Sequence, residues 1–459
     1  MSRGRPAKLV ALALSLAAAL APRPAAALQP LGEFLGAARQ HNLDRREAAV
    51  TAEQRQHQLD QARWDLTPVL SVTGSYARNQ YEAKVTLPGA DPASPVTRTI
   101  TPYNQLDAQI SLTQPLVEVG AWLQVSAARA NVAAGEARLA ATEQTVQQAV
   151  AQAYFQLVAA DAVLRSAQAA QEAARLNLSL FDQRAGVGVA SELDRRRAEV
   201  EVERVRKTLA DAEYGLAIAR QRLVSLTGVT PEDGAIDLQV VLGEEAPLAA
   251  WTGEDIAAVP SVRAAEAETE AARATYRAAK GVLYPSLSAS ANQRFTNATG
   301  FLGKVAIASA SVNLSWRFDL AAIPQVRAQK SQAALAAVRA DRARQSAHDA
   351  VHQAWHQVRA ALTKARAARV ERETSVLALK LARERYAAGA GLYLEVTQAE
   401  RDALAAEISR IQADADLALA RVSLRLAAGR PLGDVAFTVG RFAPVQQDMA
   451  EKTGEEGGR

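Results

Sequence analysis

Residues 147–160 read QQAVAQAYFQLVAA and residues 348–361 read HDAVHQAWHQVRAA, so seven of fourteen positions are identical at a constant offset of 201. The first segment lies within 125–183, which contains no proline, a single glycine (Gly135) and many strong helix formers. At ~1.5 Å per residue this stretch would make a rod of roughly 90 Å, far longer than an ordinary globular helix. A repeat on this scale indicates an internal duplication of a long helical hairpin.

Each copy of the hairpin contains a turn of small residues followed by a second helix. In the first copy, residues 185–190 read AGVGVA and precede a helix predicted over 191–226. The turn repeats at the same offset, because Gly188 aligns with Gly389. In the second copy the long helix is predicted over about 326–388. Neither turn carries a Lys-Ser/Thr pair or follows a strand, so neither is a phosphate-binding loop.

Four segments between the helices change from a period of 3.6 to a period of 2. The helices predicted over 31–64 and 260–282 are followed by Pro68 and Pro285, and proline cannot continue a helix. Beyond each proline, apolar and small polar residues alternate over about ten residues, which predicts four strands with one apolar and one polar face. The apolar positions are Leu70, Val72, Gly74 and Tyr76; Leu106, Ala108, Ile110 and Leu112; Leu287, Ala289 and Ala291; and Val312, Leu314 and Trp316.

Strands of this length and alternation are typical of a membrane β-barrel, which is apolar outside and polar inside. A soluble sheet would need helices of ordinary length to cover its apolar face, and the sequence predicts none. Four strands cannot close a barrel, and open sheet edges do not persist in lipid, so several chains must contribute. Aromatic residues near the strand ends agree with this interpretation, namely Tyr76, Tyr103, Trp122, Trp316 and Phe318.

The first 27 residues have the pattern of a secretory signal peptide. They contain four basic and no acidic residues, an apolar run over 9–21 and the small residues 25–27, which predicts cleavage after Ala27. An uncleaved N-terminal anchor is the alternative, although the apolar run is short for a span of ~20 residues.

The composition excludes several classes of function. Without the first 27 residues the chain carries 49 basic and 49 acidic side chains, so it lacks the basic excess of a nucleic-acid-binding protein. Cysteine is absent, which excludes disulfides, thiolate metal sites, a cysteine nucleophile and a lipid anchor on an N-terminal cysteine. No nucleophile–base constellation is evident, because the serines cluster in the strands and the histidines do not. We therefore expect a protein that is not an enzyme and holds no cofactor.

These patterns predict an ordered series of segments. Residues 228–255 and 430–459 are rich in glycine, proline and acidic residues and lie beyond the helical rods. The predicted organisation is a signal peptide (1–27), a first repeat (28–227, with a β-hairpin at 69–115 and a helical hairpin at 121–227), an equatorial linker (228–255), a second repeat (256–432, with a β-hairpin at 286–318 and a helical hairpin at 323–429) and a partly disordered tail (433–459).

This order of elements resembles the TolC family of outer-membrane efflux and secretion channels, over about residues 31–432. The most specific matches are Gln114-Pro115-Leu116 and the tip Arg385-Tyr386-Ala387-Ala388-Gly389. The resemblance implies a mainly α fold with membrane β-strands, in which a homotrimer forms a twelve-stranded barrel in the Gram-negative outer membrane and a helical barrel in the periplasm. It also implies a passive channel for efflux or type I secretion, served by a periplasmic adaptor (membrane fusion) protein and an inner-membrane pump of the resistance-nodulation-division or ABC type.

The same resemblance implies a gate where the hairpins end. A latch between Asp194 and Tyr386 is implied, and a carboxylate ring at the pore is reduced here to Glu395, because Gln398 occupies the second position. An arginine that completes the latch in the family falls on Gly391. The alternatives are a solvated helix face for Glu395 and simple interhelical packing for Tyr386. The turn residues expected to contact an adaptor are Gly186, Gly188, Val189, Ala190, Gly389, Gly391 and Leu392.

Two further alternatives remain open at this point. His348, His352 and His356 have i, i+4, i+8 spacing, which suits a divalent metal ion but is also that of a polar stripe. For the whole chain, the alternative to a channel is a trimeric coiled-coil surface protein without transport activity. Such a stalk would not need lipid-facing strands at two equivalent positions.

Overall fold

The computed structural model describes residues 28–88, 96–186, 191–232, 236–317, 319–430, 432 and 437–441. The predictions for the signal peptide, for Gly188, Val189 and Ala190, for Phe318 and for most of the tail fall outside these residues. The chain divides into two compact units. We call residues 47–141 and 257–346 the sheet unit, and residues 1–46, 142–256 and 347–459 the hairpin unit.

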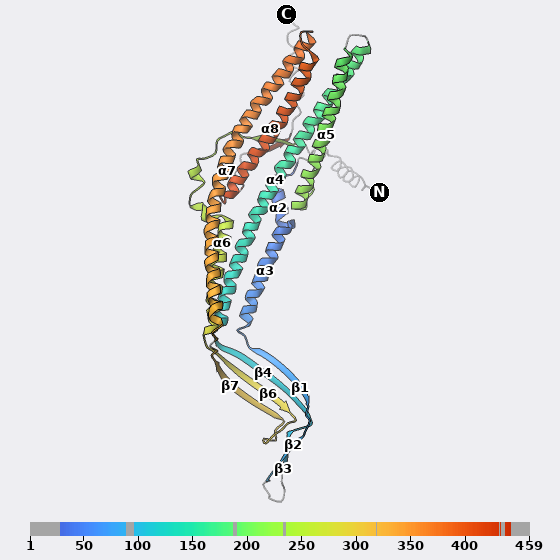
Figure 1. Ribbon diagram of the computed structural model, residues 1–459. Coiled ribbons are helices and arrows are strands. Elements are labelled where there is room, and N and C mark those ends of the chain that lie inside the picture. Colours follow the sequence, from blue (N-terminus) through green and yellow to red (C-terminus); the bar gives the residue numbers. More distant parts are fainter. Residues whose placement is uncertain are drawn as a thin grey trace, which may run out of the picture. The chain divides into compact units, whose positions relative to one another are not determined.

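An antiparallel sheet of four strands dominates the sheet unit (Figure 1). Its order is β1-β4-β6-β7, so the two predicted β-hairpins lie side by side. The sheet includes Pro115, which lies at a register shift in β4 where a missing amide proton is tolerated. The strands are β1 (Val69–Arg78), β4 (Asn104–Glu118), β6 (Ser286–Thr296) and β7 (Ala306–Ser315).

A second small sheet in this unit was not predicted. Strands β2 (Ala83–Leu87) and β3 (Val96–Thr101) form an antiparallel hairpin between β1 and β4. The strands were missed because they are only five and six residues long, too short for a reliable alternation signal.

The sheet joins its helices through a close backbone crossing. The helix α6 (Pro260–Ala279) ends in a 3-10 turn, η3 (Lys280–Leu283), before β6. A Cβ atom on Gly281 would lie 2.4 Å from the Cα atom of Gly120, so only glycine fits at this crossing.

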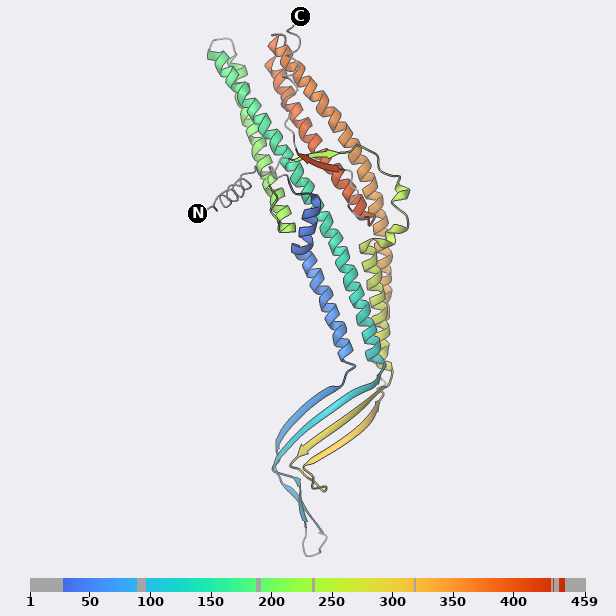
Figure 2. The same cartoon turned by 180° about the vertical axis from the view of Figure 1, so that it is seen from behind.

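Two long helical hairpins supply most of the hairpin unit (Figure 2). The helices α4 (Val119–Gly186) and α7 (Ala322–Ala387) contribute to both units and are the long rods expected from the repeat. Each is followed by a shorter partner, α5 (Glu192–Thr227) or α8 (Tyr393–Ala427). Their shared core includes Tyr154, Leu223 and Leu417, which are almost fully buried. The fold is therefore mainly α with a membrane-type sheet and an internal two-fold repeat, as predicted.

The helix predicted as one piece over 31–64 is wrong, because it breaks at Asn42. Its parts are α2 (Leu31–His41) and α3 (Leu43–Trp64). The Asn42 backbone is extended (ψ 129°), its side-chain oxygen accepts from the Arg45 amide at 3.1 Å, and its Nδ2 donates to the Leu226 carbonyl at 3.2 Å. Asparagine competes with helical backbone hydrogen bonds in this way, so the side chain ends one helix and caps the next.

A two-stranded sheet connects the linker to the C-terminal segment. The strand β5 (Ile236–Val240) pairs with β8 (Phe437–Arg441) in antiparallel register. Residues 437–441, expected in a tail, thus form regular structure. We call the segment at the end of β5, residues 240–250, the strap. It lies on the hairpin helices, where arginine side chains donate hydrogen bonds to its backbone carbonyls.

Candidate functional site: a lipid-facing sheet and the hairpin ends

The register of the four-stranded sheet brings the predicted apolar residues onto one face. Leu70 is opposite Leu112, and Val72 is opposite Ile110. Across β6 and β7, Leu287 is opposite Leu314. Most of these side chains are left exposed by the described residues; Val72 is 69% and Leu314 73% exposed, while Leu287 is partly buried. An exposed apolar face of this extent marks a surface for lipid or for another protein.

The length of the strands matches a bilayer. The ten residues of β1 extend ~33 Å along the strand, and a tilt of roughly 40° leaves about 25 Å across the membrane, the height of a typical apolar band. Aromatic residues flank this band, as expected at a lipid interface. Trp316 (69% exposed) lies at the helix end of β7, and Tyr76 (62%) lies near the other end of β1.

The opposite face of the sheet is polar and internally hydrogen-bonded. Ser71 and Ser111 pair at 2.6 Å between their hydroxyl oxygens, and Ser290 and Ser311 pair at 2.8 Å. The guanidinium of Arg294 donates to Asp107 through Nη2 (2.6 Å) and Nε (3.0 Å), which joins the two β-hairpins. The Asp107–Arg294 pair was not predicted, because neither residue shows its partner in the sequence. Such a face suits the water-filled interior of a barrel.

The two outer strands, β1 and β7, have one neighbour each in the described sheet. Their outer edges therefore present unpaired backbone donors and acceptors. Because hydrocarbon offers no hydrogen bonds, a lipid-embedded sheet requires these edges to pair with strands of other chains.

Placing a charge on the lipid-facing side should weaken membrane insertion strongly. We expect Ile110→Arg to cost ~2–4 kcal/mol of stability in the bilayer, because this position lies in the middle of the apolar face. The matched control is Ser111→Arg, the next residue, which points to the polar face. Urea unfolding of the protein refolded into lipid vesicles gives the free energy of unfolding of both variants. Equal losses would contradict the assignment of the two faces.

The α7–α8 turn, at residues 388–392, is built on a glycine in the left-handed conformation. Gly389 has φ 73°, its amide donates to the Tyr386 carbonyl (3.0 Å), and the Ala390 amide donates to the Arg385 carbonyl (2.9 Å). This pair of hydrogen bonds is a Schellman motif, which satisfies the last carbonyls of a helix. An added Cβ on Gly391 would lie 3.3 Å from both Arg385 Cβ and Glu395 Oε2, so the turn is tightly folded there.

The structure places the predicted gate residues near this end of the hairpins, each with a local contact. Asp194 accepts from Arg197 (Nη1–Oδ1 3.3 Å) in the first turn of α5, which Ser191 caps. Exposed Glu395 lies 3.5 Å from Arg385 Nη1, and Gln398 donates to Asp402 at 3.0 Å. Leu392 is 66% exposed at the turn. The latch and the carboxylate ring therefore stay predictions.

Tyr386 belongs to an aromatic cluster that connects the two hairpins. Phe181 of α4 contacts Tyr393 of α8 with ring centroids 4.4 Å apart, and Tyr386 lies within 6.4 Å of both. Burial raises the pKa of Tyr393 to about 12, so its hydroxyl stays neutral. Sequence reasoning assigned Tyr386 alone and missed the other two rings.

Two polar contacts reinforce this connection. Arg401 of α8 donates through Nε (2.9 Å) and Nη2 (2.6 Å) to Glu201 of α5, which is 5% exposed. Glu400 accepts from Asn177 of α4 at 3.0 Å and from Arg383 at 2.8 Å. Glu201 lies on the buried stripe of α5 between Ala198 and Val205, but the sequence does not show that this position is buried or which cation meets it.

A row of arginines fastens the strap to the hairpin helices. Arg421, 2% exposed, donates to the carbonyls of Val241 and Gly243, each at 2.7 Å, and lies 3.0 Å from Glu245. Burial lowers the pKa of Arg421, while the carboxylate of Glu245 opposes that effect. The other donors to the strap are Arg366, Arg369, Arg430 and Trp355.

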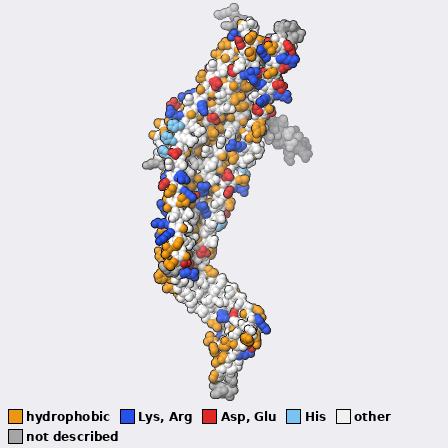
Figure 3. All heavy atoms as spheres, in the orientation of Figure 1, with side chains coloured by type: hydrophobic (Ala, Val, Ile, Leu, Met, Phe, Trp, Pro, Cys, Tyr) orange, Lys and Arg blue, Asp and Glu red, His pale blue; other side chains and the backbone are white. Residues whose placement is uncertain are grey.

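The three histidines form an exposed stripe on α7, with ring centroids 5.8 and 5.6 Å apart (Figure 3). In the part of the chain that the structure describes, no group of His, Cys, Asp or Glu could hold a metal ion. A metal site at His348, His352 and His356 stays an untested alternative to a polar stripe. Trp355 meets His356 edge to face at 4.9 Å.

The sheet and the paired hairpins together define a class of protein: a TolC-like outer-membrane channel with a large periplasmic part. The family model for the outer membrane efflux protein matches residues 34–229 and 253–430, and the chain belongs to this family. The two matched segments are the two repeats. Members of this family and the similar solved structures are passive channels rather than enzymes.

Individual relatives agree with this assignment. The chain is 26% identical over 341 residues to the outer membrane efflux protein BepC of Brucella suis, covering 71% of this chain and 74% of BepC. The fold is similar to the Campylobacter jejuni CmeC outer membrane channel, with a TM-score of 0.73, 18% identity and coverage of 88% and 86%. It is also similar to the Neisseria gonorrhoeae MtrE outer membrane channel, with a TM-score of 0.70, 20% identity and coverage of 88% and 90%.

Among the described helices, none combines the length and the apolar character needed to cross a bilayer.

Proposed function

We propose that three copies of this chain form the exit duct of a tripartite efflux pump or a type I secretion system. Each copy contributes four strands to a twelve-stranded barrel, and the hairpins continue the duct in the periplasm. The duct is passive, and the inner-membrane pump and periplasmic adaptor supply energy and cargo. The observation that carries this proposal is the four-stranded sheet with one lipid-facing side and two open edges.

The competing function is a trimeric coiled-coil surface protein. A stalk of that kind has no use for a polar sheet face lined by Ser71, Ser111 and Ser290, nor for apolar side chains on the other face. The sheet therefore favours a duct.

Single-channel recording tests the proposal directly. The full-length chain is extracted in detergent, its mass in the micelle is measured, and it is inserted into a planar bilayer. We expect trimers and long-lived conducting pores. Trimers without conductance would favour the stalk, and water-soluble monomers would contradict both functions.

We propose that Asp194 and Tyr386 hold the periplasmic end of the duct closed. Asp194→Ala is then expected to raise resting conductance several-fold, because the carboxylate no longer accepts from a neighbouring hairpin. Arg197→Ala is the control, since it removes the local partner of Asp194 but keeps the carboxylate. If the two variants conduct equally, the local ion pair rather than a latch explains Asp194.

We further propose that Glu395 of three chains forms a ring that attracts cations. A ring of carboxylates in a confined pore attracts cations. Glu395→Gln should therefore shift the reversal potential in a salt gradient toward zero and weaken block by multivalent cations. Glu384→Gln on α7 is a control carboxylate outside the ring. An unchanged reversal potential in Glu395→Gln would show that this carboxylate lies on a solvated face.

The turn residues are proposed to receive the adaptor. Gly389, Gly391 and Leu392 form a compact, partly apolar end that an adaptor helix could approach closely, and Gly186 ends α4 at the other hairpin.

A further inference from the structure

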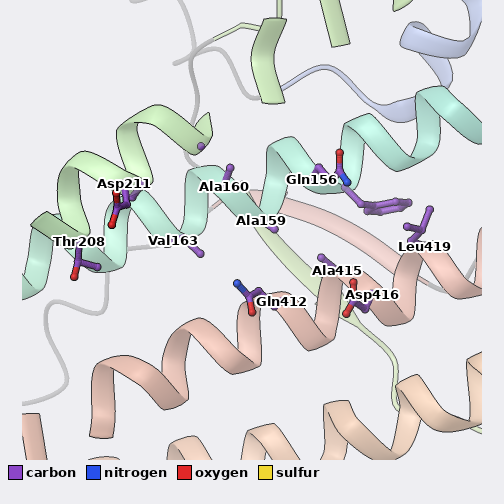
Figure 4. Close-up of a pocket in the computed structure, with 13 residues that line it drawn as sticks. Gln156, Ala159, Ala160, Val163, Thr208, Asp211, Gln412, Ala415, Asp416 and Leu419 are labelled. Carbon is purple, nitrogen blue, oxygen red and sulfur yellow. The ribbon is translucent and has the colours of Figure 1, made fainter. Parts of the chain in front are cut away.

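A pocket in the hairpin unit lies where the first hairpin meets α8. It has a volume of about 420 Å³ and is lined by α4, α5 and α8 (Figure 4). Val163 of α4 faces Gln412 of α8 across it. Four residues that share one face of α8 line the pocket: Gln412, Ala415, Asp416 and Leu419.

A second pocket, of about 470 Å³, occurs at the repeat-equivalent place on α7 and α8. Its lining follows the first at the offset of 201: Gln357 corresponds to Gln156, Ala360 to Ala159, and Lys364 to Val163. On the shorter helices, Ser409 corresponds to Thr208. The duplication has therefore preserved the groove between the two helices of each hairpin.

The two grooves differ in what covers them. The first is covered by α8 of the same chain, whereas all residues that line the second come from α7 and α8 themselves. The face of α8 that lines the first groove has a counterpart on α5 at the offset of 201. This α5 face carries Asp211, Tyr214, Gly215 and Ile218. In this structure Tyr214 is 70% and Ile218 53% exposed, whereas the corresponding Ala415 is buried. One chain thus has a groove that only its own two helices line and a largely exposed helix face, and the repeat pairs this groove with this face.

The long helices show the same difference. Phe155 of α4 lines the first pocket and is 1% exposed. Its counterpart on α7 is His356, which is exposed. Phe155 is buried where α8 covers α4, so the exposure of His356 marks the place where a covering helix is absent from α7.

We propose that α5 of a second copy of this chain covers the α7–α8 groove, with Asp211 of that copy opposite Lys364. The pair follows from the repeat. Val163 and Gln412 face each other across the first pocket, and at the offset of 201 Lys364 corresponds to Val163 and Asp211 corresponds to Gln412. Opposite charges at these two positions favour this contact between copies, whereas the corresponding internal pair, Val163 and Gln412, is neutral. By the same equivalence the histidine stripe and Trp355 flank this interface, and His356 faces Tyr214 and Ile218. This inference rests on the proposed assembly into trimers and specifies which faces meet.

Cysteine cross-linking tests the contact, because the chain contains no cysteine of its own. The full chain carrying Lys364→Cys and Asp211→Cys is treated in membranes with a short bismaleimide and run on a denaturing gel. We expect the monomer band to be lost in favour of covalent dimers and trimers. The double variant Val163→Cys with Gln412→Cys should cross-link within one chain and keep the monomer mass, which controls for the equivalence of the pockets.

A second control fixes the face of α5. Glu213 is two residues, or about 200°, around the helix from Asp211 and is also exposed. The variant Lys364→Cys with Glu213→Cys should therefore stay monomeric on the gel. Equal cross-linking from Glu213 and Asp211 would overturn the assignment of the interface.

The outcome separates this inference from the proposed function. Conducting trimers in which Lys364→Cys and Asp211→Cys do not cross-link would refute the interface and leave the duct intact, whereas failure to form trimers or pores would refute the duct. If the cysteine variants assemble poorly, exchanging the two charges tests the same contact. Lys364→Asp alone should lower the temperature at which trimers dissociate in detergent, and Lys364→Asp with Asp211→Lys should restore it. No restoration would contradict the pairing.

Discussion

Replacing Arg421 by methionine is expected to destabilise the hairpin unit by about 3–5 kcal/mol and to release the strap. The guanidinium is almost completely buried and is shared by two strap carbonyls and Glu245. Methionine keeps an unbranched apolar side chain, so the loss reports the hydrogen bonds rather than a cavity. The substitution leaves the Glu245 carboxylate without its buried cation and two carbonyls without donors, and each carries a desolvation cost.

Two measurements check this result. Urea unfolding followed by tryptophan fluorescence gives the change in stability, since Trp251 lies in the core near the strap. Limited proteolysis reports whether residues 240–250 detach. Arg366→Met is the matched control, because Arg366 donates to the Leu242 carbonyl at 3.0 Å but is about half exposed, and we expect it to cost less than ~1 kcal/mol. Equal effects of the two variants would show that burial of Arg421 is not what fastens the strap.

Removing Arg401 is expected to have the second-largest effect, at the other end of the hairpin unit. Arg401→Ala leaves Glu201 buried between α5 and α8 with no cation, which costs ~3–5 kcal/mol for a fully buried pair and less here, because Arg401 is partly exposed. The two hairpins should separate more easily at their ends, so resting conductance in planar bilayers should rise.

A double replacement distinguishes the ion pair from general damage. Arg401→Met with Glu201→Leu removes both charges and keeps apolar contact, so it should recover most of the stability lost in Arg401→Ala. Arg372→Ala is the control for a partly exposed pair, since Arg372 is about half exposed and bonds Glu407 at 3.0 Å. If Arg401→Ala and Arg372→Ala behave alike, the Glu201–Arg401 pair does not hold the hairpins together.

Much of the fold was predictable because it depends on the spacing of apolar residues and on a repeat, both of which can be read directly along the sequence. The alternation of Leu70, Val72 and Tyr76 with small polar residues predicts one lipid-facing side, and the observed register confirms it. The repeat between 147–160 and 348–361 likewise predicts the paired hairpins. Asn42 was not recognised as a helix boundary, because an isolated asparagine inside a helical pattern ends a helix only when its side chain finds partners such as the Leu226 carbonyl.

The contacts of the candidate site depended on partners that the sequence does not reveal. Glu395 and Asp194 could be placed at the hairpin ends, whereas the rings of Phe181 and Tyr393 and the pair of Glu201 with Arg401 could not. The strap is the extreme case. Backbone carbonyls are present at every residue and carry no sequence signal, so nothing marks Val241 and Gly243 as the acceptors of Arg421.

By itself, the sequence determined the long helices, the four main strands, the duplication and the amphipathic faces, because these follow from the spacing of apolar residues along one chain. Only the tertiary structure decided which distant side chains meet, since a hydrogen bond or an ion pair depends on packing that brings residues 180 or 200 positions apart to within about 3 Å. The same distinction holds for the two grooves. The offset of 201 predicts that they are equivalent, and the structure shows that α8 lines the first beside its own two helices, whereas only α7 and α8 line its copy.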